Sequence, residues 1–188
     1  MKKTLLLFVS FMGLVLLISG CGPAKLTPDV QKSFDTKAKL YTTQNMHYNI
    51  ARRGVKIVET TNYQVGMLIP VNSQVTMEAV NSRQIVFLYQ GQKVILRNQA
   101  KYTGLAINEI VKRYFSQKKV NLRKFSSKER KAILSAQVVP GMSKEAVLVS
   151  LGTPPAHATP SLEMDQWKYW RNRWTTFVVN FRHNKTIK

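Results

Sequence analysis

The sequence predicts an α+β fold, in which a small antiparallel β-rich segment precedes a region of helices and a final hairpin. Three observations support this prediction. Polar and apolar residues alternate with period two at several places between residues 41 and 99, as in half-buried strands. Apolar residues recur at helical spacing between residues 105 and 151. Two further strand-like runs, at residues 166–170 and 175–182, predict the hairpin.

The N-terminus predicts a signal peptide over residues 1–20. Lys2 and Lys3 give a basic start, and residues 5–18 are almost wholly apolar. This run is shorter than the roughly 20 residues that a membrane-spanning helix needs. Small residues follow it and lead to Cys21, which is the pattern of a secretory signal that is removed.

The residues before the expected cleavage point resemble the lipobox of bacterial lipoproteins, with the sequence Ile18-Ser19-Gly20-Cys21. The resemblance implies that Cys21 carries the lipid and that its acyl chains hold the protein to a membrane. Gly22 stands where the inner-membrane retention signal of enteric bacteria has Asp, which implies a lipid-anchored protein on the periplasmic face of the outer membrane. Because Cys21 is the only cysteine, the mature fold must hold together without disulfides.

The mature chain divides into four predicted segments. Residues 21–40 form a lipidated tether, part of which, from Asp29 to Lys39, is also compatible with a short helix. Residues 41–104 form a strand-rich β domain of four or five antiparallel strands, either a small sheet or a partial barrel. Residues 105–125 form a basic connecting helix. Residues 126–188 hold two more helices and the terminal hairpin.

Local patterns place the strands of the β domain. Residues 61–65 and 75–79 alternate, and residues 85–89 and 93–97 flank a Gln-Gly-Gln turn signal. Residues 66–70 run from Gly to Pro and predict a bend, because Pro disfavours a central strand.

The helices have clear end signals. Thr103 is a plausible cap for the helix at residues 105–117. Ser126 and Glu129 fit a capping box at the start of the next helix, in which each side chain binds the backbone amide of the other. The last helix, Ser143 to Leu151, starts with a good N-cap and is ended by the Gly and Pro that follow it.

The most specific motif surrounds this last helix. Residues 139–147 read VPGMSKEAV, and Leu-Gly-Thr-Pro follows at residues 151–154. Together with residues 167–169 and 177–181, these residues resemble the SmpA/OmlA (BamE-like) family. The resemblance implies that residues 126–188 form a two-layer module of helices on a three-stranded sheet. It also implies an accessory lipoprotein of outer-membrane barrel-protein assembly that binds partner proteins and anionic lipid.

The charge of the chain suits anionic partners. The formal net charge is +20, and a field of that sign attracts lipid headgroups, lipopolysaccharide and other polyanions. In the periplasm nucleic acid is the less expected partner. A plain solvated basic surface is the alternative. The densest basic stretch gives the candidate anionic-surface-binding residues, which are Lys112, Arg113, Lys118, Lys119, Arg123 and Lys124.

A cluster of Trp and Arg residues in the hairpin gives the candidate partner-binding site. Alternation puts Trp167 on one face of the hairpin and Trp170 on the other, so at least one Trp is expected to be exposed. Trp and Arg are the residues that anchor many protein interfaces. The alternative is that all three Trp residues are buried. The candidate partner-binding residues are Trp170, Arg171, Arg173 and Trp174.

Signatures of catalysis and cofactor binding were sought and not found in the sequence. It contains no phosphate-binding glycine loop, and His47, His157 and His183 have no metal-like spacing. We therefore expect a non-enzymatic adaptor without a cofactor or metal, and the resemblance implies that it acts in barrel assembly. A polyanion-binding lipoprotein and a component of a secretion or motility complex are the alternatives.

Overall fold

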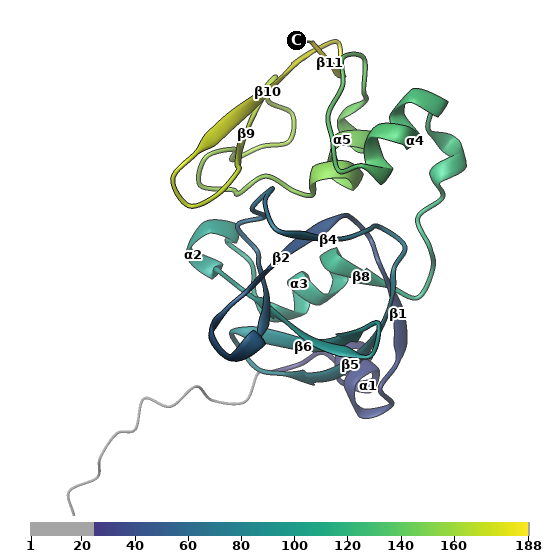
Figure 1. Cartoon of the computed structure of the whole chain (residues 1–188), viewed down its shortest axis with the longest axis vertical. Coiled ribbons are helices and arrows are strands. Elements are labelled where there is room, and N and C mark those ends of the chain that lie inside the picture. The colour runs from purple at the N-terminus through teal and green to yellow at the C-terminus, as the bar shows by residue number, and fades with distance from the viewer. Residues whose placement is uncertain (1–24, 188) are drawn as a thin grey trace, which may run out of the picture.

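The protein folds into two units joined along a polar seam (Figure 1). The structure is a computed structural model that describes residues 25–187. The predicted signal peptide at residues 1–20 and the predicted lipidation site Cys21 lie outside the described residues. No helix in the described part is long and apolar enough to cross a membrane. The larger unit lies below in Figure 1 and the smaller unit above it.

The larger unit is one curled, mixed sheet of eight strands in the order β4-β2-β3-β7-β6-β5-β1-β8. Neighbouring strands pair antiparallel except β3 and β7, which run parallel with Ile57 opposite Ile95. A short turn of 3-10 helix, η1, joins β2 to β3. The strands and this turn span Lys39–Thr42 (β1), Met46–Ile50 (β2), Arg52–Gly54 (η1), Lys56–Glu59 (β3), Met67–Ile69 (β4), Gln74–Val80 (β5), Gln84–Tyr89 (β6), Gln92–Arg97 (β7) and Phe115–Ser116 (β8).

Helix α3, Ile107–Tyr114, fills the curve of this sheet (Figure 1). Its buried side chains follow helical spacing, and Ile110 and Tyr114 reach the same core as Phe87 of β6. Phe115, just after the helix, packs edge-on to Phe87 with ring centroids 5.2 Å apart. The short helix α2, Ala100–Thr103, precedes α3 at the rim of the sheet.

The predicted fold class is wrong. The protein is β-rich: the described residues form an eight-stranded curled mixed sheet and a three-stranded sheet, with five short helices. It is not a small antiparallel segment followed by a two-layer module of helices on a three-stranded sheet. The prediction missed β1 to β4, which have only three to five residues each and so show little alternation. It also missed the parallel pairing of β3 with β7, because such pairing leaves no local signal.

Two predictions within the β domain are also wrong. Residues 61–65 alternate but form no strand, and Thr61 and Asn62 are buried in a loop. The expected bend at residues 66–70 contains strand β4, which pairs only with β2. Its edge position accounts for the Pro at its end, since an edge strand tolerates a residue without an N–H group. The strands predicted at residues 75–79, 85–89 and 93–97 are confirmed as β5, β6 and β7.

Part of the segment interpreted as a tether belongs to the larger unit. Helix α1 spans Pro28–Asp35 and buries Val30 and Phe34 in the core of the curled sheet. Its length of eight residues agrees with the short helix that the sequence allowed there. The residues after it lead directly into β1, and Leu40 is also buried.

The smaller unit has a separate apolar core under its own sheet, whose strand order is β11-β10-β9. Trp167 and Tyr169 of β9 are fully buried in this core, together with Ile133 of α4 and Val147 of α5. The helices predicted here are confirmed, with Ser126 and Ser143 as N-caps. The elements are η2 (Leu122–Lys124), α4 (Ser127–Leu134), α5 (Lys144–Leu151), β9 (Gln166–Trp170), β10 (Thr176–Arg182) and β11 (Lys185–Thr186).

Glu129 of α4 joins three elements of the smaller unit. One carboxylate oxygen accepts from the backbone and hydroxyl of Ser126, at 3.0 and 2.9 Å, which closes the predicted capping box. The other accepts from the backbone and hydroxyl of Ser143 at the start of α5, at 2.8 and 3.0 Å, and lies 3.6 Å from Nζ of Lys185 in β11. Burial alone would raise the pKa of Glu129, but these hydrogen bonds outweigh it and lower the pKa to about 2.

The seam between the units is made by amide side chains of the larger unit and the C-terminal end of α5. Nδ2 of Asn45 donates to the carbonyls of Ile133 and Ser150, at 2.6 and 2.9 Å. The side chains of Asn62 and Gln64 both donate to the carbonyl of Leu151. The last carbonyls of a helix have no partner within it, so the larger unit completes the end of α5.

Replacing Glu129 by Gln should reduce the free energy of unfolding by about 3 kcal/mol at pH 7. The pKa falls from 4.5 to about 2 on folding, and one pKa unit is worth about 1.4 kcal/mol. A carboxyl with a lowered folded-state pKa stabilises fully above its unfolded pKa and loses that effect as the pH falls through the folded value. The difference between wild type and Glu129→Gln should therefore close between about pH 4.5 and 2. Chemical denaturation over this range measures it, and a difference independent of pH would contradict the assignment.

Gly152 ends α5 at a φ of +78°, where an added Cβ would collide with the side-chain amides of Asn62 and Gln44. Gly152→Ala should cost about 3 kcal/mol or more, from backbone strain and from displacement of the seam. Gly104→Ala is the matched control, because Gly104 has a φ of +70° but open space around it, and should cost about 1 kcal/mol. Equal losses of stability in the two variants would show that the seam does not depend on Gly152.

Candidate functional site

The tip of the β9–β10 hairpin is the most exposed aromatic surface of the described chain. The turn at residues 171–175 is closed by a hydrogen bond of 2.8 Å from the backbone of Arg171 to the carbonyl of Thr175. Oδ1 of Asn172 accepts from the backbone amides of Trp174 and Thr175, at 2.8 and 2.9 Å. Asn172 thus fixes the turn in a shape that points Trp174 away from the core.

Trp174 is 81% exposed, far more than any other large apolar side chain of the described residues. The guanidinium of Arg173 lies 4.6 Å from the centroid of its ring, in cation–π contact. The expectation of an exposed Trp is therefore confirmed. Trp167 is buried and Trp170 is half-buried, on opposite faces of β9 as alternation predicted.

A stack of rings joins the hairpin to the larger unit. The ring of His157 lies 5.0 Å from that of Trp170 and 4.7 Å from that of Tyr102 at α2. The backbone amide of Gln64 donates to the carbonyl of Trp170 at 3.0 Å. These contacts hold the hairpin against the rim of the curled sheet, so the tip is presented on a fixed base.

A cleft of about 230 Å³ lies beside this stack, between the hairpin tip and the larger unit. Trp170, Arg173 and Trp174 line one side of it, and Tyr63 lies opposite. Oγ1 of Thr61 also lines the cleft and is buried without a hydrogen-bond partner among the described residues. The cleft therefore combines aromatic faces, a guanidinium and an unpaired hydroxyl.

Arg171 points to the other side of the hairpin. It lines a larger groove of about 590 Å³ between β10 and the loop at residues 135–140. The structure thus brings three of the four predicted partner-binding residues to the tip cleft and places the fourth in the groove. That these residues bind a partner stays a prediction.

The six predicted anionic-surface-binding residues lie in the last turn of α3, in η2 and in the loop between them, and several have internal partners. Lys112 is 3.2 Å from a carboxylate oxygen of Asp29 in α1. Lys124 pairs with Glu145 of α5. The Nζ atom of Lys119 lies 5.1 Å from the centroid of the Tyr41 ring. The remaining three residues are Arg113, which is half-buried, and Lys118 and Arg123, which are exposed.

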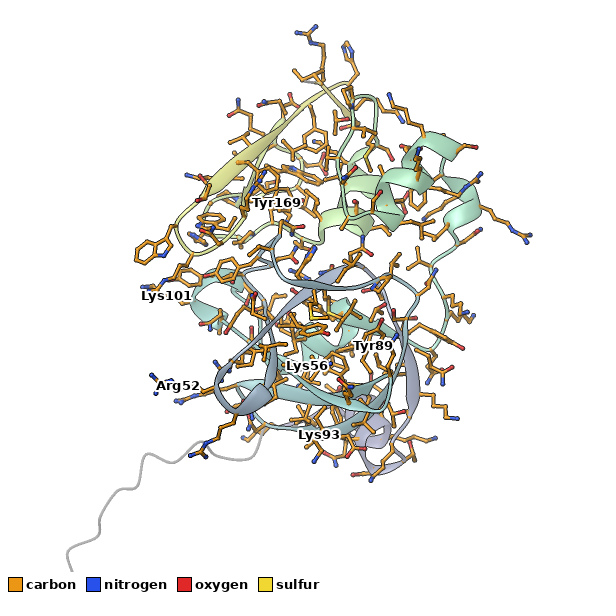
Figure 2. All side chains as sticks on the ribbon, viewed as in Figure 1. Arg52, Lys56, Tyr89, Lys93, Lys101 and Tyr169 are labelled. Carbon is orange, nitrogen blue, oxygen red and sulfur yellow. The ribbon has the colours of Figure 1, made fainter. Side chains whose placement is uncertain are left out.

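The sequence analysis missed a second basic surface, at η1 and β7. Arg53, Val55 and Lys93 line a cleft of about 480 Å³, and none of the described residues that line it is an acid. Figure 2 labels Lys93 and Arg52 on this lower part of the larger unit. Val55 is 38% exposed and Ile50, just before η1, is 60% exposed. The sequence feature that could have indicated this basic surface is the Arg-Arg-Gly-Val run at residues 52–55, which closely follows the apolar residue Ile50.

The sequence analysis tested the histidines only for metal-like spacing, which they lack, and gave them no other role. His157 lies in the ring stack of the hairpin, and His47 lines the groove. Burial lowers the pKa of His47, which favours its neutral form. Within the described residues, no group of three or more His, Cys, Asp or Glu side chains could hold a metal ion.

In comparisons with protein-family models, curated proteins and solved structures, nothing matches this chain. Its function is therefore argued from the surfaces of the hairpin, from the charge and from the sequence motifs.

Proposed function

We propose that this protein is a non-enzymatic, lipid-anchored adaptor of the bacterial envelope that docks a protein partner on the tip of its β9–β10 hairpin. The predicted lipidation at Cys21 supports attachment to a membrane. The likeness of residues 139–154 to the SmpA/OmlA family motif supports outer-membrane barrel-protein assembly as the process that it serves.

The single observation that carries the proposal is the exposure of Trp174 at a fixed position. An indole that is 81% exposed gains nothing for the fold from its apolar surface. Its neighbour Arg173 supplies a charge beside it, and Asn172 holds both in place. Trp and Arg anchors of this kind contribute most of the affinity in many protein interfaces.

Affinity purification after crosslinking in intact cells tests this proposal. The double variant Arg173→Ala with Trp174→Ala should reduce recovery of the partner at least about tenfold, because hot-spot residues contribute about 2 kcal/mol or more. Leu134→Ala, which removes another exposed apolar side chain from α4, is the control and should leave recovery unchanged. Equal recovery with the double variant would contradict docking at the tip. Tip-dependent recovery of a complex without barrel-assembly components would contradict the process that we assign.

A second candidate function, binding to an anionic lipid surface, is favoured by the basic surface at η1. None of the ion pairs in the described part of the chain involves Arg52, Arg53 or Lys93. The exposed apolar side chains of Ile50 and Val55 lie in the same segment. Basic and apolar side chains together are typical of a surface that contacts anionic headgroups.

Vesicle co-sedimentation at increasing salt tests the second candidate. Each Lys or Arg near an anionic bilayer contributes about 1 kcal/mol, so replacing all three of Arg52, Arg53 and Lys93 by Gln should weaken binding to phosphatidylglycerol vesicles about tenfold or more. The matched control replaces the exposed residues Lys32, Arg83 and Arg182 by Gln, with the same change in charge. Equal losses in the two triple variants would show a diffuse charge effect and contradict a defined surface at η1.

A further inference from the structure

The groove on the Arg171 side of the hairpin continues a slot that a strand of the protein already occupies in part. Strand β11 lies between β10 and residues 141–143. It pairs with β10 through Thr186 opposite Phe181, and the backbone amide of Ile187 donates to the carbonyl of Asn180 at 2.9 Å. On its other side, Thr186 exchanges backbone hydrogen bonds of 2.8 Å with Gly141 and Met142.

Beyond Ile187 the two walls of this slot continue without a strand between them in the described part of the chain. The start of β10 forms one wall and the loop at residues 135–140 forms the other, with Leu151 of α5 between them. The groove holds about 590 Å³. Strands pair about 4.8 Å apart and rise about 3.3 Å per residue, so the gap beside the first half of β10 fits a short extended segment.

The edge of β10 that faces the groove has unused backbone hydrogen-bonding groups. Asn180 directs its carbonyl toward β11, whereas the amide of Phe181 donates in the opposite direction, to the carbonyl of Asp165 at 2.7 Å. Because these directions alternate along a strand, the N–H and C=O groups of Val178 and Thr176 point away from β9, toward the side of β11. Val178 lines the groove and is 47% exposed.

The groove is also lined by residues with unpaired polar groups. Nδ1 of His47 and Oε1 of Gln64 are buried and have no hydrogen-bond partner among the described residues. Among the described residues that line the groove, Arg171 carries a positive charge and none is an acid. Arg171 directly follows β9 and lies beside the residue before β10, since its amide donates to the carbonyl of Thr175.

We propose that this groove binds an extended peptide segment of a partner protein, which adds as a strand to the free edge of β10. The segment runs in the direction of β11 and antiparallel to β10, so its downstream end reaches Arg171. It carries apolar side chains at alternate positions against Leu151 and Phe177, and a carboxylate at its downstream end. This site is separate from the tip at Trp174, and the proposal stands without the docking that we assign to the tip.

The test is a titration of the isotope-labelled full chain in detergent micelles with the tetrapeptide acetyl-Thr-Val-Thr-Val, followed by amide NMR signals. Saturable shifts of the Val178 and Thr176 amides at about millimolar peptide are expected. The same peptide with N-methylated threonines lacks the N–H groups that would pair with the carbonyls of Val178 and Thr176, and it should cause no such shifts. The C-terminal amide form should bind about tenfold more weakly, because it lacks the charge-assisted bond to Arg171.

Variants of the chain separate the groove from general charge effects. Arg171→Gln should remove the preference for the free carboxylate while leaving the shifts of Val178 in place. Arg182→Gln, at the other end of β10, should preserve that preference. A peptide with an amidated end and a final Asp tests whether a side-chain carboxylate serves equally. Shifts confined to the Trp174 tip, equal binding of the N-methylated peptide, or no saturable shift of the β10 amides would each overturn the proposal.

Discussion

The rest of the structure depends on one requirement: the carbonyl groups at the C-terminal end of α5 need hydrogen-bond donors from outside the helix. A helix leaves its last carbonyls without partners, and a buried carbonyl that stays unpaired costs about 1–3 kcal/mol. Here the larger unit supplies the donors: the backbone of Asn45 to Val149, the side chain of Asn45 to Ser150, and the amides of Asn62 and Gln64 to Leu151. The hydroxyl of Tyr169 completes the set at Gly152, with a hydrogen bond of 3.0 Å. The two units therefore belong together although each has its own apolar core.

This seam also decides which surfaces the hairpin presents. Gln64 binds the end of α5 through its side chain and the carbonyl of Trp170 through its backbone. The ring stack through His157 adds a second attachment to the larger unit. The hairpin is thus held at its base, with an aromatic cleft on one side and the strand-edge groove on the other. One hairpin therefore presents two different surfaces, one on each side.

The parts of the structure that follow from short stretches of sequence could be predicted, and those that depend on distant pairing could not. Ser143 and Gly152 define α5 because capping is local, and the alternation in β9 correctly put Trp167 and Trp170 on opposite faces. The fold class was wrong because β1 to β4 are short and because β3 pairs with a strand far along the chain. Alternation predicted an exposed Trp in the hairpin, but the exposed one is Trp174 in the turn, which alternation along a strand does not place. The roles of His47 and Asn62 were not predictable, since both depend on residues brought close only by the complete fold.

The polar seam bears on the order in which the two units fold during synthesis. Asn45, Asn62 and Gln64 all precede α5 in the sequence, so a chain emerging from the N-terminus presents the cap before the helix that it completes. Domains generally fold as units during synthesis, with the N-terminal one first. By that order we expect the larger unit to fold first and to offer its amide donors to the end of α5 once the later part of the chain has emerged.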